Sequence, residues 1–124
     1  MKKLLNIAII QSDIIWEDPN QNRLNFSKKI ENIGEVDVIV LQEMFSTGFT
    51  INVEEVFETM DGDTVNLMLK KAAEKDALIL GSIIIKEKDS FFNRLVVAFP
   101  NGELIFYDKK HLFSYAGEDK VFSS

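Results

Sequence analysis

The chain has 124 residues, with 14 Lys and Arg against 20 Asp and Glu, a formal net charge of -6 and 46% hydrophobic residues. This length and composition fit one soluble globular domain with a hydrophobic core, and they exclude a disordered or collagen-like chain. The acidic balance, with no block of Lys or Arg, argues against nucleic acid or an anionic membrane surface as the main partner, and the absence of cysteine excludes disulfides, Cys-ligated zinc sites and a thiol nucleophile on this chain.

The N-terminus has some features of a secretory signal. The basic start Met1–Lys3 precedes an apolar run over residues 4–10. However, Asn6 interrupts that run, and the polar residues 11–13 end it without a small-residue cleavage site. No segment approaches the ~18 apolar residues that span a bilayer, so we expect a cytoplasmic protein.

The first third of the chain predicts a strand, a helix and a second strand. Residues 5–10 form an Ile-rich apolar run, which is typical of a strand buried on both faces. Asp18 and Pro19 are suited to the N-cap and first position of a helix that ends before Gly34. Residues 36–41 repeat the buried-strand pattern. Together these elements predict a βαβ crossover.

The middle of the chain predicts a second helix and then a hairpin. Thr64 is the expected N-cap of a helix with one apolar face. Residues 77–85 and 91–99 are apolar and are joined by the charged turn 86–90, which predicts two antiparallel strands.

A further antiparallel strand is expected after the hairpin. Asn101 and Gly102 indicate a tight two-residue turn leading to a strand over residues 104–107. From residue 108 onward the chain becomes polar and aromatic, and we expect no further periodic element there. The sheet is therefore predicted to be mixed.

Glu43 is the first candidate functional residue. It follows the second predicted strand, and ligands of α/β sheets gather at the carboxyl ends of parallel strands. A carboxylate this close to an apolar run would be partly desolvated and able to accept a proton. The alternative is a solvated charge that opens a loop, which is the more usual state of a loop carboxylate.

Two segments give the sequence a specific resemblance. Residues 41–49 (LQEMFSTGF) and 107–113 (YDKKHLF) together resemble the carbon-nitrogen hydrolase (nitrilase) superfamily, as do residues 6–11, Asn93 and residues 101–102. Within it the chain looks most like the omega-amidase branch, which hydrolyses the terminal amide of small 2-oxo dicarboxylic acid monoamides. Many members have Pro where this chain has Gln42, a difference that leaves the following carboxylate in place.

The resemblance implies a Glu-Lys-Cys triad that acts through a thioester. Glu43 would be the general base, Lys109 would stabilise the anionic tetrahedral intermediate, and Glu118 would support the lysine and position the substrate. This chemistry is coherent, because an amide is a poor electrophile that needs an activated nucleophile and a positive charge near the developing oxyanion.

The nucleophile is the main departure from the family pattern. The family carries its cysteine on a later strand, beyond the lysine segment, and this chain has no cysteine. Residues 1–124 therefore resemble the amino-terminal half of a longer hydrolase domain, truncated before the nucleophile, and we expect this chain alone to be inactive.

The remaining candidates have structural alternatives. Phe45, Phe49 and Tyr115 are candidates to line a substrate pocket, but with 10 Phe in the chain core packing is the default for any one of them. His111 fits a buried structural histidine that positions the lysine loop better than an acid or base, and Lys110 a surface residue.

Other features indicate no further site. Trp16 and the acidic residues Glu54, Glu55 and Glu58 are interpreted as surface or lid features. No set of metal ligands and no Gly-rich phosphate loop is present in the sequence, so we expect no metal or cofactor.

These observations predict an α/β fold: a mixed sheet of about five strands with two helices on one face. It resembles half of the four-layer α-β-β-α nitrilase sandwich. The other face of the sheet would then be apolar and exposed, which predicts homodimers or higher oligomers.

The predicted function is hydrolysis of a small-molecule omega-amide such as 2-oxoglutaramate by the full-length parent. The alternatives are another amidase or carbamoylase of the superfamily, or a non-catalytic binding or assembly domain in which Glu43 and Lys109 form a structural ion pair.

Overall fold

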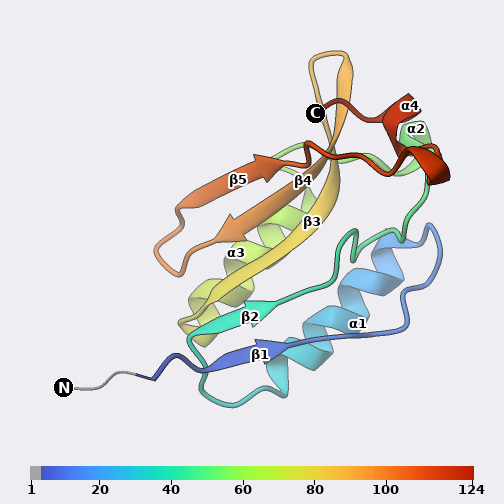
Figure 1. Ribbon diagram of the computed structural model, residues 1–124. Helices are drawn as coiled ribbons and strands as arrows, with labels where there is room; N and C mark the ends of the chain where they lie inside the picture. The colour runs from blue at the N-terminus through green and yellow to red at the C-terminus, as the bar shows by residue number, and fades with distance from the viewer. Residues whose placement is uncertain (1–3) are drawn as a thin grey trace.

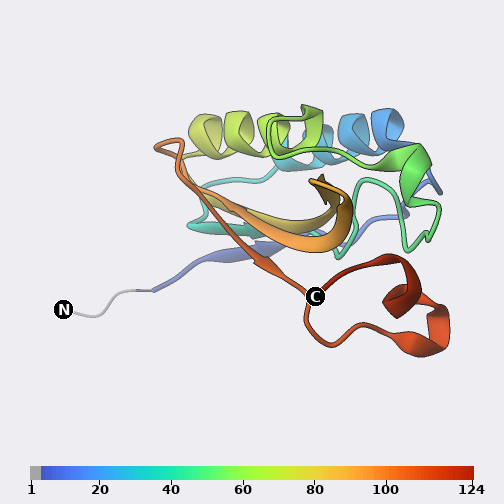
Figure 2. The ribbon, with the colours of Figure 1, turned by 90° about the horizontal axis from the view of Figure 1, so that it is seen from above.

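The computed structural model describes residues 4–124 and shows a five-stranded sheet with two long helices on one of its faces (Figure 1). The helices α1 (Pro19–Glu31) and α3 (Asp63–Lys75) lie side by side over that face (Figure 2). Met1–Lys3, the basic part of the signal-like start, lie outside the described residues. Over the described part of the chain, no helix has both the length and the hydropathy needed to cross a membrane.

The sheet is mixed, as the sequence predicts. Its strands are β1 (Ile7–Ile9), β2 (Val38–Val40), β3 (Leu78–Glu87), β4 (Ser90–Ala98) and β5 (Leu104–Asp108). They lie in the order β1-β2-β3-β4-β5, with the first two pairings parallel and the last two antiparallel. Helix α1 connects the first parallel pair, and α3 lies in the connection between β2 and β3, so the predicted fold class is confirmed.

The start of α1 is the predicted one, whereas the cap of α3 is not. Asp18 accepts a hydrogen bond from the Gln21 amide (3.1 Å), and Pro19 is the first helical residue. In α3 the N-cap is Gly62, not Thr64. The carboxylate of Glu58 satisfies the helix start instead.

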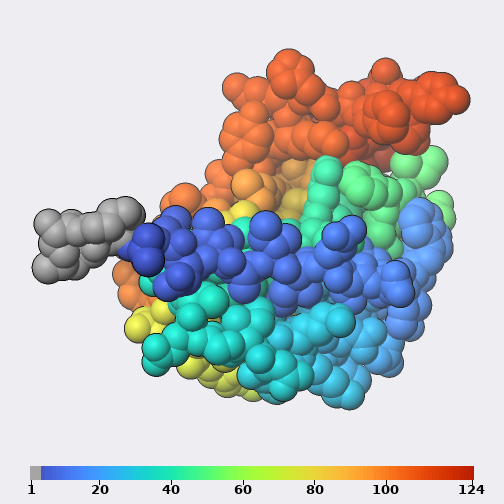
Figure 3. Space-filling model, turned by 60° about the horizontal axis from the view of Figure 1, so that its bottom comes forward, coloured from blue at the N-terminus to red at the C-terminus, as the bar shows by residue number. Residues whose placement is uncertain are grey.

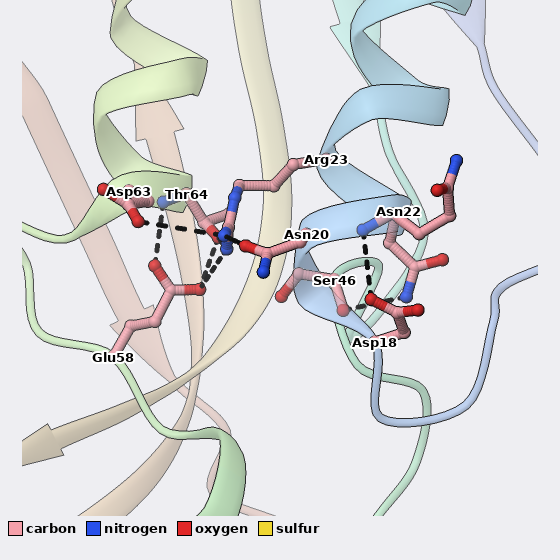
Figure 4. Close-up of polar contacts among 9 residues, drawn as sticks. Asp18, Asn20, Asn22, Arg23, Ser46, Glu58, Asp63 and Thr64 are labelled. Carbon is pink, nitrogen blue, oxygen red and sulfur yellow. Dashed lines mark hydrogen bonds and ion pairs between the residues drawn. The ribbon is translucent and has the colours of Figure 1, made fainter.

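Glu58 is therefore a structural residue and not the surface feature that the sequence indicates. Its largely buried carboxylate accepts from the Thr64 amide (2.8 Å) and from the Thr64 hydroxyl, and it lies 3.5 Å from the Arg23 guanidinium of α1 (Figure 4). The first amides of a helix need acceptors, and a side chain distant in sequence provides them here. This contact also ties α1 to α3.

The turn between β4 and β5 is one residue longer than predicted. The Phe99 amide donates to the Glu103 carbonyl (2.9 Å), and the Gly102 amide donates to the Phe99 carbonyl (3.0 Å). Only Gly102 in this loop has a positive φ, of 93°. A two-residue type I′ turn needs positive φ at both central residues, whereas Pro100 prefers the first central position of a type I turn. The result is a three-residue loop.

Three short helical segments lie where the sequence predicts loops. They are α2 (Val53–Val56), the 3₁₀ helix η1 (Ser114–Ala116) and α4 (Glu118–Val121). Such short segments are too brief to show an amphipathic period in the sequence. Val53, Val56 and Phe122 pack with Met44 and Ile84 into a small core at this end of the sheet.

The face of the sheet away from the helices carries a continuous apolar row. In register across the five strands it contains Ile9, Val40, Leu80, Val97 and Ile105. Ile9 is 75% exposed, so the prediction that the first strand is buried on both faces is wrong for this chain. In Figure 3 the blue N-terminal strand and the orange-red C-terminal segment border a hollow on this side.

Candidate functional site

The three charged residues proposed from the sequence come together in space. Glu43 follows β2, Lys109 follows β5, and Glu118 is the first residue of α4. The Lys109 Nζ lies 3.0 Å from Glu43 Oε2 and 3.0 Å from Glu118 Oε1. One ammonium therefore bridges two carboxylates that are far apart in sequence.

Asn93 of β4 joins the same cluster. Its side-chain nitrogen donates to Glu43 Oε2 (2.7 Å) and to Glu118 Oε2 (3.0 Å), and its side chain is almost fully buried. Its backbone carbonyl accepts from the Lys109 amide (3.0 Å). Asn93 thus contacts all three charged residues.

The environment favours the charged forms of Lys109 and Glu118. Partial burial opposes the charge on Lys109, but hydrogen bonds to Glu43 and Glu118 outweigh it and raise its pKa. Burial likewise acts to raise the pKa of Glu118, but hydrogen bonds from the Phe113 amide (2.7 Å), Asn93 and Lys109 outweigh it and lower that pKa. A lysine and a glutamate that hold each other ionised are the expected result of such close contact.

The backbone directly after Glu43 is held in an unusual conformation. The next residue, Met44, has a positive φ of 52°, and its amide donates to the Ser82 hydroxyl of β3 (2.8 Å). Asn22 of α1 donates to the Ser46 carbonyl (2.9 Å), which fixes the following turn (Figure 4). Non-glycine residues rarely adopt a positive φ, and such a conformation persists only where the surrounding structure holds the backbone in place. Contacts with β3 and α1 therefore define where Glu43 points.

Close packing against β3 adds to this restraint. A Cβ atom built at Gly81 would lie 2.9 Å from Leu41 Cβ and 2.9 Å from Phe45 Cδ1. The segment that carries Glu43 therefore lies so close to β3 that a side chain at position 81 would overlap it. Glycine is needed here for the close approach and not for its backbone freedom.

An open cavity of about 330 Å³ lies beside the charged cluster. Its lining combines polar side chains at one edge with apolar ones: Glu43, Ser82, Asn93 and Lys109 together with Leu41, Gly81, Leu95 and Tyr107. A small molecule in this cavity would meet a carboxylate and an ammonium at its wall. Few polar groups in an otherwise apolar concavity are typical of small-molecule sites.

The three aromatic residues suggested for substrate binding occupy different places. Phe45 is fully buried in the main core, with its ring centroid 5.3 Å from that of Phe26, and it does not line the cavity. Phe49 is exposed, and its ring centroid lies 6.0 Å from the Lys109 Nζ. Tyr115 is 93% exposed in η1. Only Phe49 lies next to the charged cluster, where it also lines an adjacent cavity of about 300 Å³.

Other residues singled out from the sequence lie at the surface. His111 is exposed, so the prediction of a buried structural histidine is wrong, and Lys110 is exposed as predicted. Glu54, Glu55 and Trp16 are exposed as well. Among residues 4–124, no group of three or more His, Asp or Glu side chains is arranged to hold a metal ion.

Sequence reasoning missed the supporting roles of Asn93 and Ser82. Both are polar residues inside apolar strands, and a buried polar side chain in such a strand needs a hydrogen-bond partner. The rule predicts that each of them has a hydrogen-bond partner. It does not identify the partners, which lie on other elements.

Comparisons with known proteins agree on one family. Residues 6–124 match the carbon-nitrogen hydrolase family. The chain is 39% identical over 114 residues to "Omega-amidase YafV" of Escherichia coli (strain K12), covering 92% of this chain and 44% of that protein. It is 30% identical over 123 residues to "2-oxoglutaramate amidase" of Bacillus subtilis (strain 168), covering 95% of this chain and 47% of that protein. The chain thus spans about half the length of the curated relatives it matches.

Solved structures give the same result. The crystal structure of XC1258 from Xanthomonas campestris, described as a CN-hydrolase superfamily protein with an arsenic adduct in the active site, superposes with a TM-score of 0.93 at 35% identity. The match covers 97% of this chain and 46% of that one. Saccharomyces cerevisiae Nit3, of the nitrilase superfamily, shares the fold with a TM-score of 0.79 at 20% identity, covering 96% of this chain and 48% of that one.

Proposed function

The chain belongs to the carbon-nitrogen hydrolase family, and we propose that the complete protein hydrolyses the terminal amide of small omega-amides such as 2-oxoglutaramate, releasing ammonia. The names of the relatives in Escherichia coli and Bacillus subtilis support this substrate class. So does the cavity, whose polar wall and modest volume suit a small polar molecule.

The observation that carries the proposal is the position of Lys109 between Glu43 and Glu118. In the proposed mechanism Glu43 removes the proton from a thiol, and the thiolate attacks the amide carbon. The Lys109 ammonium stabilises the oxyanion of the tetrahedral intermediate. The carbon-nitrogen bond then breaks, the proton passes to the leaving nitrogen, and ammonia departs. Water activated by Glu43 finally hydrolyses the thioester to the carboxylic acid.

Glu118 has a supporting role in this proposal. Its buried carboxylate holds the Lys109 ammonium 3.0 Å away without facing open solvent. It thereby keeps the lysine charged and directed toward the cavity while Glu43 exchanges its proton. Phe49 is the one aromatic residue that we retain as a candidate substrate contact, because it borders Lys109.

The thiol is proposed to come from outside residues 1–124. The chain contains no cysteine, and the family resemblance implies a cysteine on a strand that follows the lysine segment. We therefore propose that the present chain cannot form the thioester intermediate by itself and is catalytically inactive. Its contribution is the base, the ammonium and the residues that hold them.

The decisive experiment measures ammonia release from 2-oxoglutaramate by the product of the reading frame continued past Ser124. Activity should be present in the wild type and should disappear in Glu43→Gln and Lys109→Ala. Lys110→Ala, which changes the exposed neighbouring lysine, is the matched control and should leave the rate unchanged. Activity that persists in either site variant would show that these roles are misassigned.

The same assay separates the alternatives. Preference for glutamine or N-carbamoyl amino acids over 2-oxoglutaramate would indicate a different amidase or carbamoylase of the family. No activity on any of these amides, with the fold intact, would favour a binding or assembly domain in which Glu43 and Lys109 form a structural ion pair. The cytoplasmic location stays a prediction, which cell fractionation tests.

A further inference from the structure

We propose that Asn93 is the positioning residue of this site: its side-chain amide clamps the Glu43 and Glu118 carboxylates against the Lys109 ammonium and leaves Glu43 Oε1 as the oxygen that accepts the proton. The role of Glu43 Oε1 as proton acceptor rests on the proposed function. The hydrogen bonds of Asn93 to the two carboxylates do not depend on it.

The two donors of the Asn93 side-chain nitrogen match two carboxylate acceptors of the cluster. Ionised carboxylates only accept hydrogen bonds, whereas an asparagine side-chain nitrogen carries two donors. Those donors are directed at Glu43 Oε2 (2.7 Å) and Glu118 Oε2 (3.0 Å). The nitrogen must face the carboxylates, because the amide oxygen would repel them. Asn93 therefore offsets the repulsion between two like charges without adding a charge of its own.

The two oxygens of Glu43 are left in different situations. Oε2 accepts from both Asn93 (2.7 Å) and the Lys109 Nζ (3.0 Å). No partner for Oε1 is found among residues 4–124. An oxygen that already accepts two short, charge-stabilised hydrogen bonds is a weaker proton acceptor than a free one. The free oxygen, Oε1, is thus the one available to a reacting group.

Asn93 is the rigid member of the cluster. The Glu43 side chain is 41% exposed, and a lysine ammonium sits on a flexible four-carbon stem. Asn93 is only 2% exposed and is paired with Ile84 in the ladder between β4 and β3. Its carbonyl also accepts from the Lys109 amide (3.0 Å). Backbone and side chain of one strand residue therefore place Lys109 and both carboxylates.

The first test uses the complete enzyme with two substitutions of similar size. Asn93→Leu removes both donors, and Asn93→Asp replaces the donor with a third carboxylate facing Glu43, Glu118 and Lys109. Each should lower kcat about 10- to 100-fold, the effect expected of a misplaced catalytic group, while KM changes less than about threefold because the other residues that line the cavity are unchanged.

The pH profile separates positioning from a purely structural role. A protonated carboxyl group can donate one hydrogen bond, so the ratio of kcat in Asn93→Asp to kcat in Asn93→Leu should rise as the pH falls. Taking the ratio removes the titration of the other site groups that both variants share. Val96→Ala, a core change on the same strand, is the control for stability and should leave kcat unchanged. A flat ratio, or a kcat loss in Val96→Ala equal to that of Asn93→Leu, would overturn the proposal.

The second test needs no activity. In the present chain, the Glu118 carboxyl is titrated by NMR in the wild type, Asn93→Leu and Val96→Ala. Loss of a hydrogen bond to the ionised form should raise the pKa of Glu118 in Asn93→Leu alone. An unchanged Glu118 titration would overturn the proposed clamp. An inactive complete wild-type enzyme would instead overturn the proposed function, and the NMR result would still decide the clamp.

Discussion

Replacing Gly81 with alanine tests whether close packing against β3 holds the segment that carries Glu43. The added Cβ would lie 2.9 Å from Leu41 Cβ and 2.9 Å from Phe45 Cδ1. Carbon atoms in favourable contact are about 3.5–4.0 Å apart. The new methyl group would therefore overlap two different side chains by roughly 0.6 Å or more each.

Neither neighbour can move away easily. The Leu41 Cβ is attached directly to a backbone whose amide donates to the Leu80 carbonyl (2.7 Å). The Phe45 ring is fully buried and packs edge-on against Phe26. Inserting a methyl group into such a site costs about 1–3 kcal/mol. We expect Gly81→Ala to lie in the upper half of that range, because both contacts are with anchored atoms.

The assay is urea unfolding of the chain, with Gly34→Ala as the matched control. A Cβ at Gly34 would meet no atom within 4 Å, and such a substitution stabilises by about 0.4–1 kcal/mol where the backbone permits it. In the complete enzyme, Gly81→Ala should also lower kcat, because the Glu43 segment must shift. Equal free energies of unfolding for Gly81→Ala and Gly34→Ala would refute the packing argument.

Three further predictions concern stability and association. The pKa of Glu118 is lowered in the folded state. Its stabilising contribution is therefore present above the unfolded pKa and is lost as the pH falls through the folded pKa. The stability difference between the wild type and Glu118→Gln should shrink as the pH falls below the ordinary carboxyl pKa of 4.5, and a constant difference would contradict this. Glu58→Ala removes the acceptor for the start of α3 and should lower the free energy of unfolding by about 1–2 kcal/mol. The control Glu54→Ala, at an exposed position, should change that free energy by less than ~0.5 kcal/mol. Equal effects of the two substitutions in thermal or urea unfolding would argue against the cap. The exposed apolar sheet face should drive self-association of this chain, which Ile9→Lys should weaken in light scattering; a monomeric wild type that binds no hydrophobic dye would disprove the idea.

The elements that the sequence predicts correctly are those set by local patterns. Asp18 and Pro19 mark the start of α1 because a cap depends on a few consecutive residues. Short apolar runs bounded by polar residues are typical of buried strands, and the order strand, helix, strand is typical of a parallel pair joined by a crossover. The motifs around Glu43 and Lys109 indicate the family, because two motifs occur together in the expected order and at the expected separation. These inferences need no knowledge of distant neighbours.

The errors share a different cause. Glu58 looks like a surface acid, but it accepts the first amides of α3 and pairs with Arg23. Phe45 lies next to a candidate catalytic residue in sequence, but it points into the core. His111 follows the lysine segment and precedes apolar residues, but it is exposed. In each case the outcome depends on which element packs on the residue, and no local pattern encodes that.

The sequence by itself determined the fold class, the chain order of the main elements and the candidate charges Glu43, Lys109 and Glu118. Only the tertiary structure decided that one ammonium lies within 3.0 Å of both carboxylates and that Asn93 holds them there. The physical reason is the short range of hydrogen bonds and ion pairs. Local periodicity specifies the direction of a side chain relative to its own strand or helix. The partner that it meets within hydrogen-bond distance is set by the packing of elements that are remote in the chain.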